Sequence, residues 1–314
     1  MNHRAFTLVE LGAALSVAGM AVALGAAAAR GPRDRANQVK DATQVRVITQ
    51  AMIIFATGNK DAYPLPSALD RNNDTVKDQG RAKDTTANIF SILIFNSSIS
   101  PEIAVSPVET NAKIREHKTY DNGAPKAAVR PNNALWDPAF SADFTSEKGG
   151  NFSYAHLEPS GAAIGADAGR ANRWSNTFNA EEAVLCNRGP EMTSVAYADL
   201  PRGMKQKHEP DPAKPTYGNP ASNTFSFYKG LQQRPGTWWS GNVAYNDNHV
   251  DFIGDYLSPG QPVVSGARYL NSKESWMPDM AFFDEPDDPK GVNNFLGVFT
   301  KAGEKPSEFK AIWD

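Results

Sequence analysis

One stretch of the sequence places side-chain oxygens at a spacing that suits a hard metal ion. In Asp70-Arg71-Asn72-Asn73-Asp74 the oxygens fall at positions 1, 3 and 5 of a calcium loop, and Asp78 falls at position 9. Position 6 is Thr75 where such loops have Gly, and position 12 is Arg81 where they have a bidentate Glu. Two interpretations stay open. The stretch is either a solvated polar loop or a calcium site made by Asp70, Asn72, Asp74 and Asp78, and no other cofactor is predicted.

The other residues that could do chemistry are scattered along the chain. The five histidines are His3, His117, His156, His208 and His249. None of them lies at a metal-ligand spacing from another histidine or from the single cysteine. Cys186 closes the apolar run Ala183–Cys186, so we expect it to be a small buried apolar residue. The sequence contains no nucleophile-elbow motif, Gly-rich phosphate loop or Cys-x-x-Cys pair. We therefore expect a protein that is not an enzyme.

Trp238 and Trp239 could form a stacking platform for a sugar. Neighbouring residues of a strand point to opposite faces of the sheet. We therefore favour one tryptophan in the core and one at the surface.

Glu10 is the only charged residue in the 24 residues from Phe6 to Ala29. As a helix this stretch would be roughly 36 Å long, enough to cross a hydrocarbon core of about 30 Å. Small residues at four-residue spacing, such as Gly12 and Ser16, would let helices pack closely. A carboxylate within a membrane costs on the order of 2.5–3.5 kcal/mol. Glu10 therefore either reaches water at the interface or has a partner.

The residues from Arg4 to Leu11 read Arg-Ala-Phe-Thr-Leu-Val-Glu-Leu, and this stretch resembles the processing site of type IV prepilins and type II secretion pseudopilins. The resemblance implies that a prepilin peptidase cuts between Ala5 and Phe6 on the cytoplasmic side and that the new amine is methylated. It also implies that Glu10 pairs with the Phe6 amine of a neighbouring subunit during assembly. The family normally has Gly where this chain has Ala5.

The resemblance implies a structural subunit, minor or specialised, of a type IV pilus-like or type II secretion pseudopilus filament. Its partners would be the prepilin peptidase, other pilin or pseudopilin subunits, and the membrane. It would cross the inner membrane once with its head outside the cytoplasm, and after assembly it would lie in a filament in the periplasm or at the cell surface. The Lys and Arg residues that flank the apolar stretch do not favour this orientation.

Two rival functions come from other classes. The alternative that we keep is a membrane-tethered extracytoplasmic binding module that does not polymerise. A membrane-anchored hydrolase is the weaker rival, because no catalytic constellation is present in the sequence.

The composition is that of a folded protein without a nucleic-acid-binding surface. Apolar residues make up 40% of the 314 residues and charged residues 21%, which excludes a disordered chain. The net charge is −3 and no run of Lys and Arg occurs, so we expect no nucleic-acid partner. A single cysteine excludes an intramolecular disulfide.

The resemblance implies a pilin-like α+β fold, in which a long N-terminal helix, half in the membrane and half in the head, packs on a small antiparallel sheet with large loops. Gly31-Pro32 should break or kink the helix, and Asp34 could cap its second half. That half has helical spacing from Val39 to Phe55 or Ala56 and should end at Gly58-Asn59. The Tyr63-Pro64 turn that follows resembles the same region of pseudopilins.

The remaining elements are predicted to be short. Thr86–Asn96 could be a buried helix or a strand, and we favour a helix. Four runs bounded by turn residues predict strands: Asn151–His156, Ala183–Cys186, Asn242–Tyr245 and His249–Ile253.

The last two of these runs flank Asn246-Asp247-Asn248, which suits a tight hairpin turn. The hairpin resembles the closing hairpin of a pilin-like family named for His, nine intervening residues and Asp-Gly. Here Thr237 stands at the His position and Asn248 at the Gly position, so only the fold implied by the motif is carried over.

These features divide the chain into four parts. Residues 1–5 would be the leader and 6–30 the transmembrane or filament-core helix. Residues 31–254 would form the head, and 255–314 a C-terminal extension of it without an assigned function.

Overall fold

The main element of the computed structural model is a six-stranded antiparallel sheet, in the order β10-β9-β1-β2-β5-β6. The structure describes residues 30–160, 169–197, 212–231, 239–256, 268–270, 276–285 and 293–314. The strands of this sheet are β1 (Tyr154–Leu157), β2 (Ala183–Asn187), β5 (Trp239–Tyr245), β6 (Val250–Tyr256), β9 (Leu296–Lys301) and β10 (Lys310–Ile312). Two hairpin-like sheets accompany it, made by β3 (Met192–Tyr197) with β4 (Pro212–Tyr217) and by β7 (Arg268–Leu270) with β8 (Trp276–Pro278).

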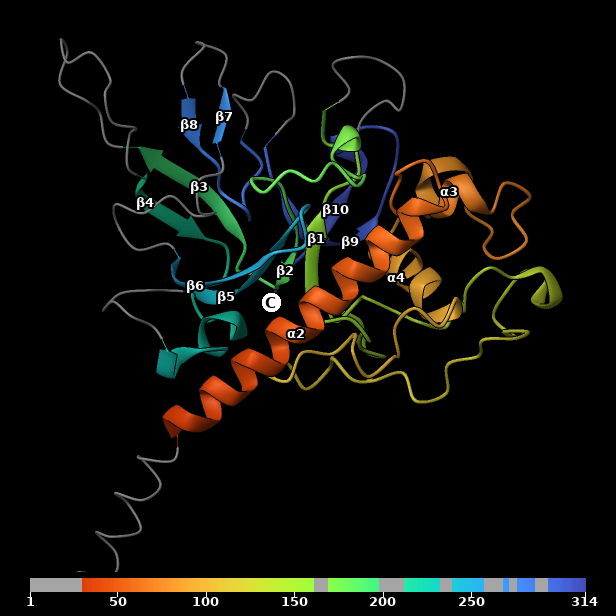
Figure 1. Cartoon of the computed structure of the whole chain (residues 1–314), viewed down its shortest axis with the longest axis horizontal. Helices are drawn as coiled ribbons and strands as arrows, with labels where there is room; N and C mark the ends of the chain where they lie inside the picture. The colour runs from red at the N-terminus through yellow and green to blue at the C-terminus, as the bar shows by residue number, and fades with distance from the viewer. Residues whose placement is uncertain are drawn as a thin grey trace, which may run out of the picture.

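Helix α2 (Arg30–Thr57) runs diagonally in front of this sheet and packs on β2, β5 and β6 (Figure 1). Gly31 and Pro32 belong to its first turn, and the residues before Arg30, which the predicted break or kink would separate from α2, lie outside the described residues. Asp34 lies inside the helix and does not cap it. After Thr57 the side chain of Asn59 bonds the Phe55 carbonyl, which satisfies one of the last carbonyls of the helix.

The structure contradicts the predicted fold class of a long N-terminal helix on a small sheet. The sheet is the main body of the molecule, and the described residues contain no long apolar helix. α2 carries charged side chains along its length, among them Arg33, Lys40 and Arg46. The sheet is larger than predicted because strands from the last part of the chain join it.

The predicted hairpin near residue 246 is confirmed. β5 and β6 pair antiparallel with Ala244 opposite Val250 and Asn242 opposite Phe252. Asn248 has φ +68°, the left-handed conformation that Asn tolerates in such turns. The runs predicted as strands at 151–156 and 183–186 correspond to β1 and β2.

The predicted helix at 86–96 is confirmed as α4 (Thr86–Phe95), whose Thr85 side chain accepts from the Asn88 backbone N–H at its N-terminus. The first helical residue also ties α4 to the sheet. The Thr86 hydroxyl accepts a 2.7 Å hydrogen bond from the Phe299 backbone N–H in β9. A shorter helix, α3 (Pro66–Leu69), follows the Tyr63-Pro64 turn.

The C-terminal residues belong to the main sheet. β9 pairs with β1, with His156 opposite Gly297, and β10 pairs with β9. The predicted extension at 255–314 therefore contributes two of the six strands. Their residues are distant in sequence from β1, and pairing over such distances leaves no local signal.

Candidate functional site

The residues predicted to carry processing and assembly, Ala5, Phe6 and Glu10, lie outside the described residues, as does the whole predicted span from Phe6 to Ala29. Within the described ranges, no helix is both long enough and apolar enough to cross a membrane. The part of the chain that the structure describes therefore gives no support to the predicted transmembrane helix or to the predicted single-pass location in the inner membrane.

The predicted calcium ligands are used differently in the structure. Asp70 is buried, and one of its carboxylate oxygens lies 3.0 Å from the Nζ of buried Lys83. The other oxygen accepts a 2.7 Å hydrogen bond from the Asp74 backbone N–H. The Asp74 carboxylate is itself paired with Arg130 at 2.7 Å.

Asn72 and Asp78, the other two predicted ligands, are exposed. Within the described residues no group of three or more His, Cys, Asp or Glu could hold a metal ion. The calcium site stays a prediction, and the contacts of Asp70 point to a role in fixing the loop.

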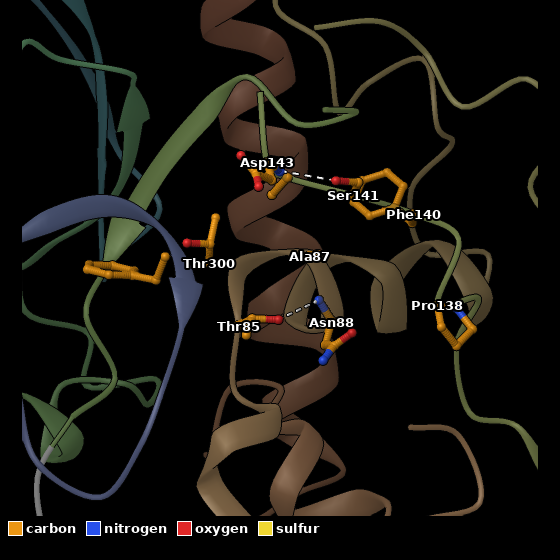
Figure 2. A pocket seen from close by; sticks show the side chains of 10 residues that line it. Thr85, Ala87, Asn88, Pro138, Phe140, Ser141, Asp143 and Thr300 are labelled. Carbon is orange, nitrogen blue, oxygen red and sulfur yellow. Dashed lines mark hydrogen bonds between the residues drawn. The ribbon is translucent and has the colours of Figure 1, made fainter. Parts of the chain in front are cut away.

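A surface recess of about 250 Å³ lies between the N-terminus of α4 and residues 138–143, beside β9 (Figure 2). The polar groups around it have partners within the chain. Asn88 donates to the Lys83 carbonyl and accepts from the Trp136 indole. The Asp143 carboxylate accepts from Thr145 and Ser146. The recess therefore offers a binding molecule few free polar groups.

His156 and Cys186 are buried in the sheet and do not face solvent. His156 Nδ1 lies 2.8 Å from the Leu157 carbonyl, which can only accept, so Nδ1 donates. Nε2 lies 2.8 Å from the Thr86 hydroxyl. Burial lowers the pKa of His156 to about 3, so the ring is neutral and Nε2 accepts from Thr86.

Burial also raises the pKa of the Cys186 thiol well above its usual value, so it stays protonated. The expectation that Cys186 is a small buried residue is confirmed. Trp239 is also in the core, while Trp238 lies outside the described residues.

A buried polar site lies between α2 and the sheet, around Asp41. This carboxylate is fully buried and accepts four hydrogen bonds. Ser106 and Tyr154 donate to Oδ1 at 2.5 and 3.1 Å. Tyr228 and Asn242 donate to Oδ2 at 2.8 and 2.6 Å.

All four donors to Asp41 are neutral, and they come from four separate segments of the chain. Desolvation and the nearby Asp41 charge raise the pKa values of Tyr154 and Tyr228, so both hydroxyls keep the protons that they donate. The cluster can hold α2 in one register on β1 and β5, and its buried, fully bonded atoms leave no open position for a substrate.

Asp41 was missed by sequence reasoning, although a signal was present. It lies four, seven and eleven residues before Val45, Ile48 and Met52, all buried on one face of α2. Val39, which the predicted pattern placed on that face, is instead 62% exposed. A carboxylate in the apolar stripe of a helix needs buried donors, and this requirement could have indicated the cluster.

A second polar cluster fixes the end of α2. The Tyr63 hydroxyl donates to the Asn246 side chain in the β5–β6 turn. Asn246 Nδ2 in turn donates to Glu182 at 3.0 Å, and Arg173 lies 3.5 Å from the other oxygen of that carboxylate. The Tyr63-Pro64 turn, the β5–β6 turn and the loop before β2 are thus held together.

Comparisons with known proteins identify no relative for this chain. No family model, no curated protein and no solved structure matches it. These comparisons therefore give no support to the predicted membership of a pilus or of a type II secretion system.

Proposed function

We propose that this chain is a structural subunit of a pilus-like filament, cut by a prepilin peptidase between Ala5 and Phe6 and assembled through its N-terminal segment. The proposal rests on the stretch from Arg4 to Leu11, in which the cut position is followed by Phe6 and, four residues later, by Glu10. Its neighbours in the assembly would be further subunits of the same kind.

The attachment of α2 to the sheet is the structural observation that supports the proposal. A filament subunit must transmit force between the segment through which it assembles and its head. Here α2, which begins at Arg30, packs on three strands and is held in place by the hydrogen bonds of the buried Asp41. Removing a buried, hydrogen-bonded carboxylate from its donors is costly, so α2 and the sheet should move as one body.

The buried state of the reactive side chains favours this function over a hydrolase. His156 is neutral and enclosed by aromatic rings, and Cys186 is a buried thiol. Neither side chain is placed to meet a substrate, so the proposal assigns no catalytic residue.

The decisive experiment is mass spectrometry of the N-terminus of the full chain, produced with and without an active prepilin peptidase. The proposal expects a mature chain that begins at Phe6 only when the peptidase is active. Ala5→Gly should be cut at least as fast, because Gly is what the peptidase family normally meets. An uncut N-terminus in both strains would overturn the proposal.

Glu10 provides the second test. Glu10→Ala should leave cleavage intact but prevent filaments from being seen by electron microscopy. A binding module that does not polymerise would form no filaments with Glu10 either, and that result would favour the alternative function.

A further inference from the structure

The two ends of α2 carry opposite charges on their exposed sides. Near its start the exposed side chains include Arg33, Arg35 and Lys40, and the exposed Lys229 follows Tyr228, which bonds Asp41. We call Arg33, Arg35, Val39, Lys40 and Lys229 the basic end. The acidic residues in this region are the half-buried Asp34 and Glu102, which lies 4.0 Å from Lys40 in an exposed pair.

The other end of α2 is acidic. Asp61 follows the helix, and its carbonyl accepts a 2.8 Å hydrogen bond from the Asn176 N–H. The Asn246 N–H bonds the Glu182 carbonyl at 2.9 Å, which brings the β5–β6 turn beside the same loop.

We call the surface formed by Asp61, Phe178, Glu181, Asp247 and Asp251 the acidic end. All five residues are exposed. The other charged groups that face it are Lys60, which is exposed, Arg173, which is paired with Glu182, and His249, which lies between Asp247 and Asp251.

Each end also exposes a large apolar side chain. Phe178 is 70% exposed at the acidic end, and Val39 is 62% exposed at the basic end. Ile54, in the last turn of α2, is 62% exposed as well. Phe178 has φ +58°, a left-handed conformation that is unfavourable for a bulky residue. The backbone thus carries strain where an apolar ring meets solvent, and this combination is typical of a contact site.

The two surfaces lie at opposite ends of one rigid element. At 1.5 Å per residue, the 28 residues of α2 separate its ends by about 42 Å. Two complementary surfaces on opposite ends of one molecule make a heterologous contact, and such contacts propagate into an open chain of copies unless their rotation closes a ring.

We infer that the acidic end of one copy docks on the basic end of the next copy, with Phe178 packing beside Val39. The inference rests on the proposed function and names the contact between heads within that assembly. Opposite charges select this pairing over contacts between two like ends, which would bring charges of the same sign together.

The test is cysteine cross-linking of the full chain in cells. The only native cysteine is buried, so cysteines placed at two exposed alanines, Ala36→Cys at the basic end and Ala180→Cys at the acidic end, provide the accessible thiols. With a short bifunctional maleimide, a chain that carries both substitutions should form a ladder of multimers. Either single variant alone should stay monomeric, while the two single variants together should form a dimer. Cross-linking of a single variant to itself would overturn the inference.

Charge reversal makes the test specific. Arg35→Glu or Glu181→Lys alone should lower the yield of the ladder about tenfold, which corresponds to about 1.4 kcal/mol, and the two together should restore it. No described contact pairs the side chain of Arg35 or of Glu181 with another residue, so neither reversal should disturb the fold. A ladder that is insensitive to both reversals would refute the pairing.

Phe178→Asn separates packing from folding. Asn tolerates the left-handed conformation, so this variant should be at least as stable as the parent chain in chemical unfolding, yet it should lose most of the ladder. An unchanged ladder would exclude Phe178 as the apolar anchor.

The result is distinguishable from failure of the proposed function. Filaments without the Ala36–Ala180 cross-link would contradict this contact and leave the proposed function intact. A cross-linked ladder from chains that are never cut before Phe6 would support this contact and contradict the proposed function.

Discussion

Asp41 in α2 and Asn242 in β5 are joined by a 2.6 Å hydrogen bond, from the Asn242 amide to the Asp41 carboxylate, across a fully buried interface. The two residues are 201 positions apart in the chain. This contact and the three other donors to Asp41 fix where the helix lies on the sheet. A carboxylate without a cationic partner is tolerated here because four neutral donors replace its water.

Asp41→Ala should lower the free energy of unfolding by on the order of 3–5 kcal/mol, because four buried donors lose the carboxylate that accepts from them. Among the described contacts, only Tyr154 and Asn242 have another acceptor nearby, on Gln44 and Gln38. Chemical unfolding followed by tryptophan fluorescence would measure the loss. Thr43→Ala, on the exposed side of the same helix, is the matched control and should change the free energy by less than about 0.5 kcal/mol. Equal effects of the two substitutions would exclude the proposed role of Asp41.

Tyr63 and Asn246 should be energetically coupled. Tyr63→Phe removes one hydroxyl and leaves the Asn246 carbonyl oxygen without its donor, at a cost of about 1–2 kcal/mol. In a double-mutant cycle with Asn246→Ala, the second substitution should cost less once the first is present. Strictly additive losses would show that the contact does not stabilise the turn.

The role of Asp70 predicts independence from calcium. Asp70→Ala removes the carboxylate that neutralises the buried Lys83 ammonium, although the backbone carbonyl at position 70 still accepts from it, and should cost about 3–5 kcal/mol. Because that carboxylate is occupied by Lys83, the loss should be the same with added calcium and with a chelator. Asp78→Ala, at an exposed predicted ligand, is the control. A stability difference that appears only with calcium would instead support the metal site predicted from the sequence.

Glu285 should make the protein less stable as the pH rises. Burial, and then the neighbouring Asp279 carboxylate, raise the pKa of Glu285 well above its usual value, so the folded protein keeps it protonated. A carboxyl group whose pKa is higher in the folded protein stabilises the fold fully at a pH below its pKa in the unfolded chain, about 4.3. This stabilisation is lost as the pH rises through the pKa that the group has in the folded protein.

Glu285→Gln removes this titration. The free energy of unfolding of the variant, relative to the parent chain, should therefore become more favourable between pH 5 and pH 8. The comparison at each pH cancels the contribution of His156, whose lowered pKa acts in the opposite direction because its stability is lost as the pH falls. A difference between the two proteins that does not change with pH would contradict the assignment.

Several local elements could be predicted because their signals lie within a few residues. The β5–β6 hairpin follows from two alternating runs around Asn246-Asp247-Asn248, and the helix at α4 follows from its apolar run. The surroundings of a side chain could not be predicted in the same way. Asp70 has the spacing of a calcium ligand, and only the structure shows that Lys83, thirteen residues later, folds back and pairs with it.

By itself the sequence determined the hairpin, the short helix and the buried nature of Cys186. It also supplies the proposed cut before Phe6, because a peptidase would read a short linear segment. Only the tertiary structure decided the size of the sheet, the register of α2 and the opposite charges at its two ends. These features depend on residues far apart in the chain, such as Asp41 with Asn242 and His156 with Gly297. Their contacts form only when the chain closes long loops, and the stabilising free energy of burial that repays this closure is not visible in any local pattern.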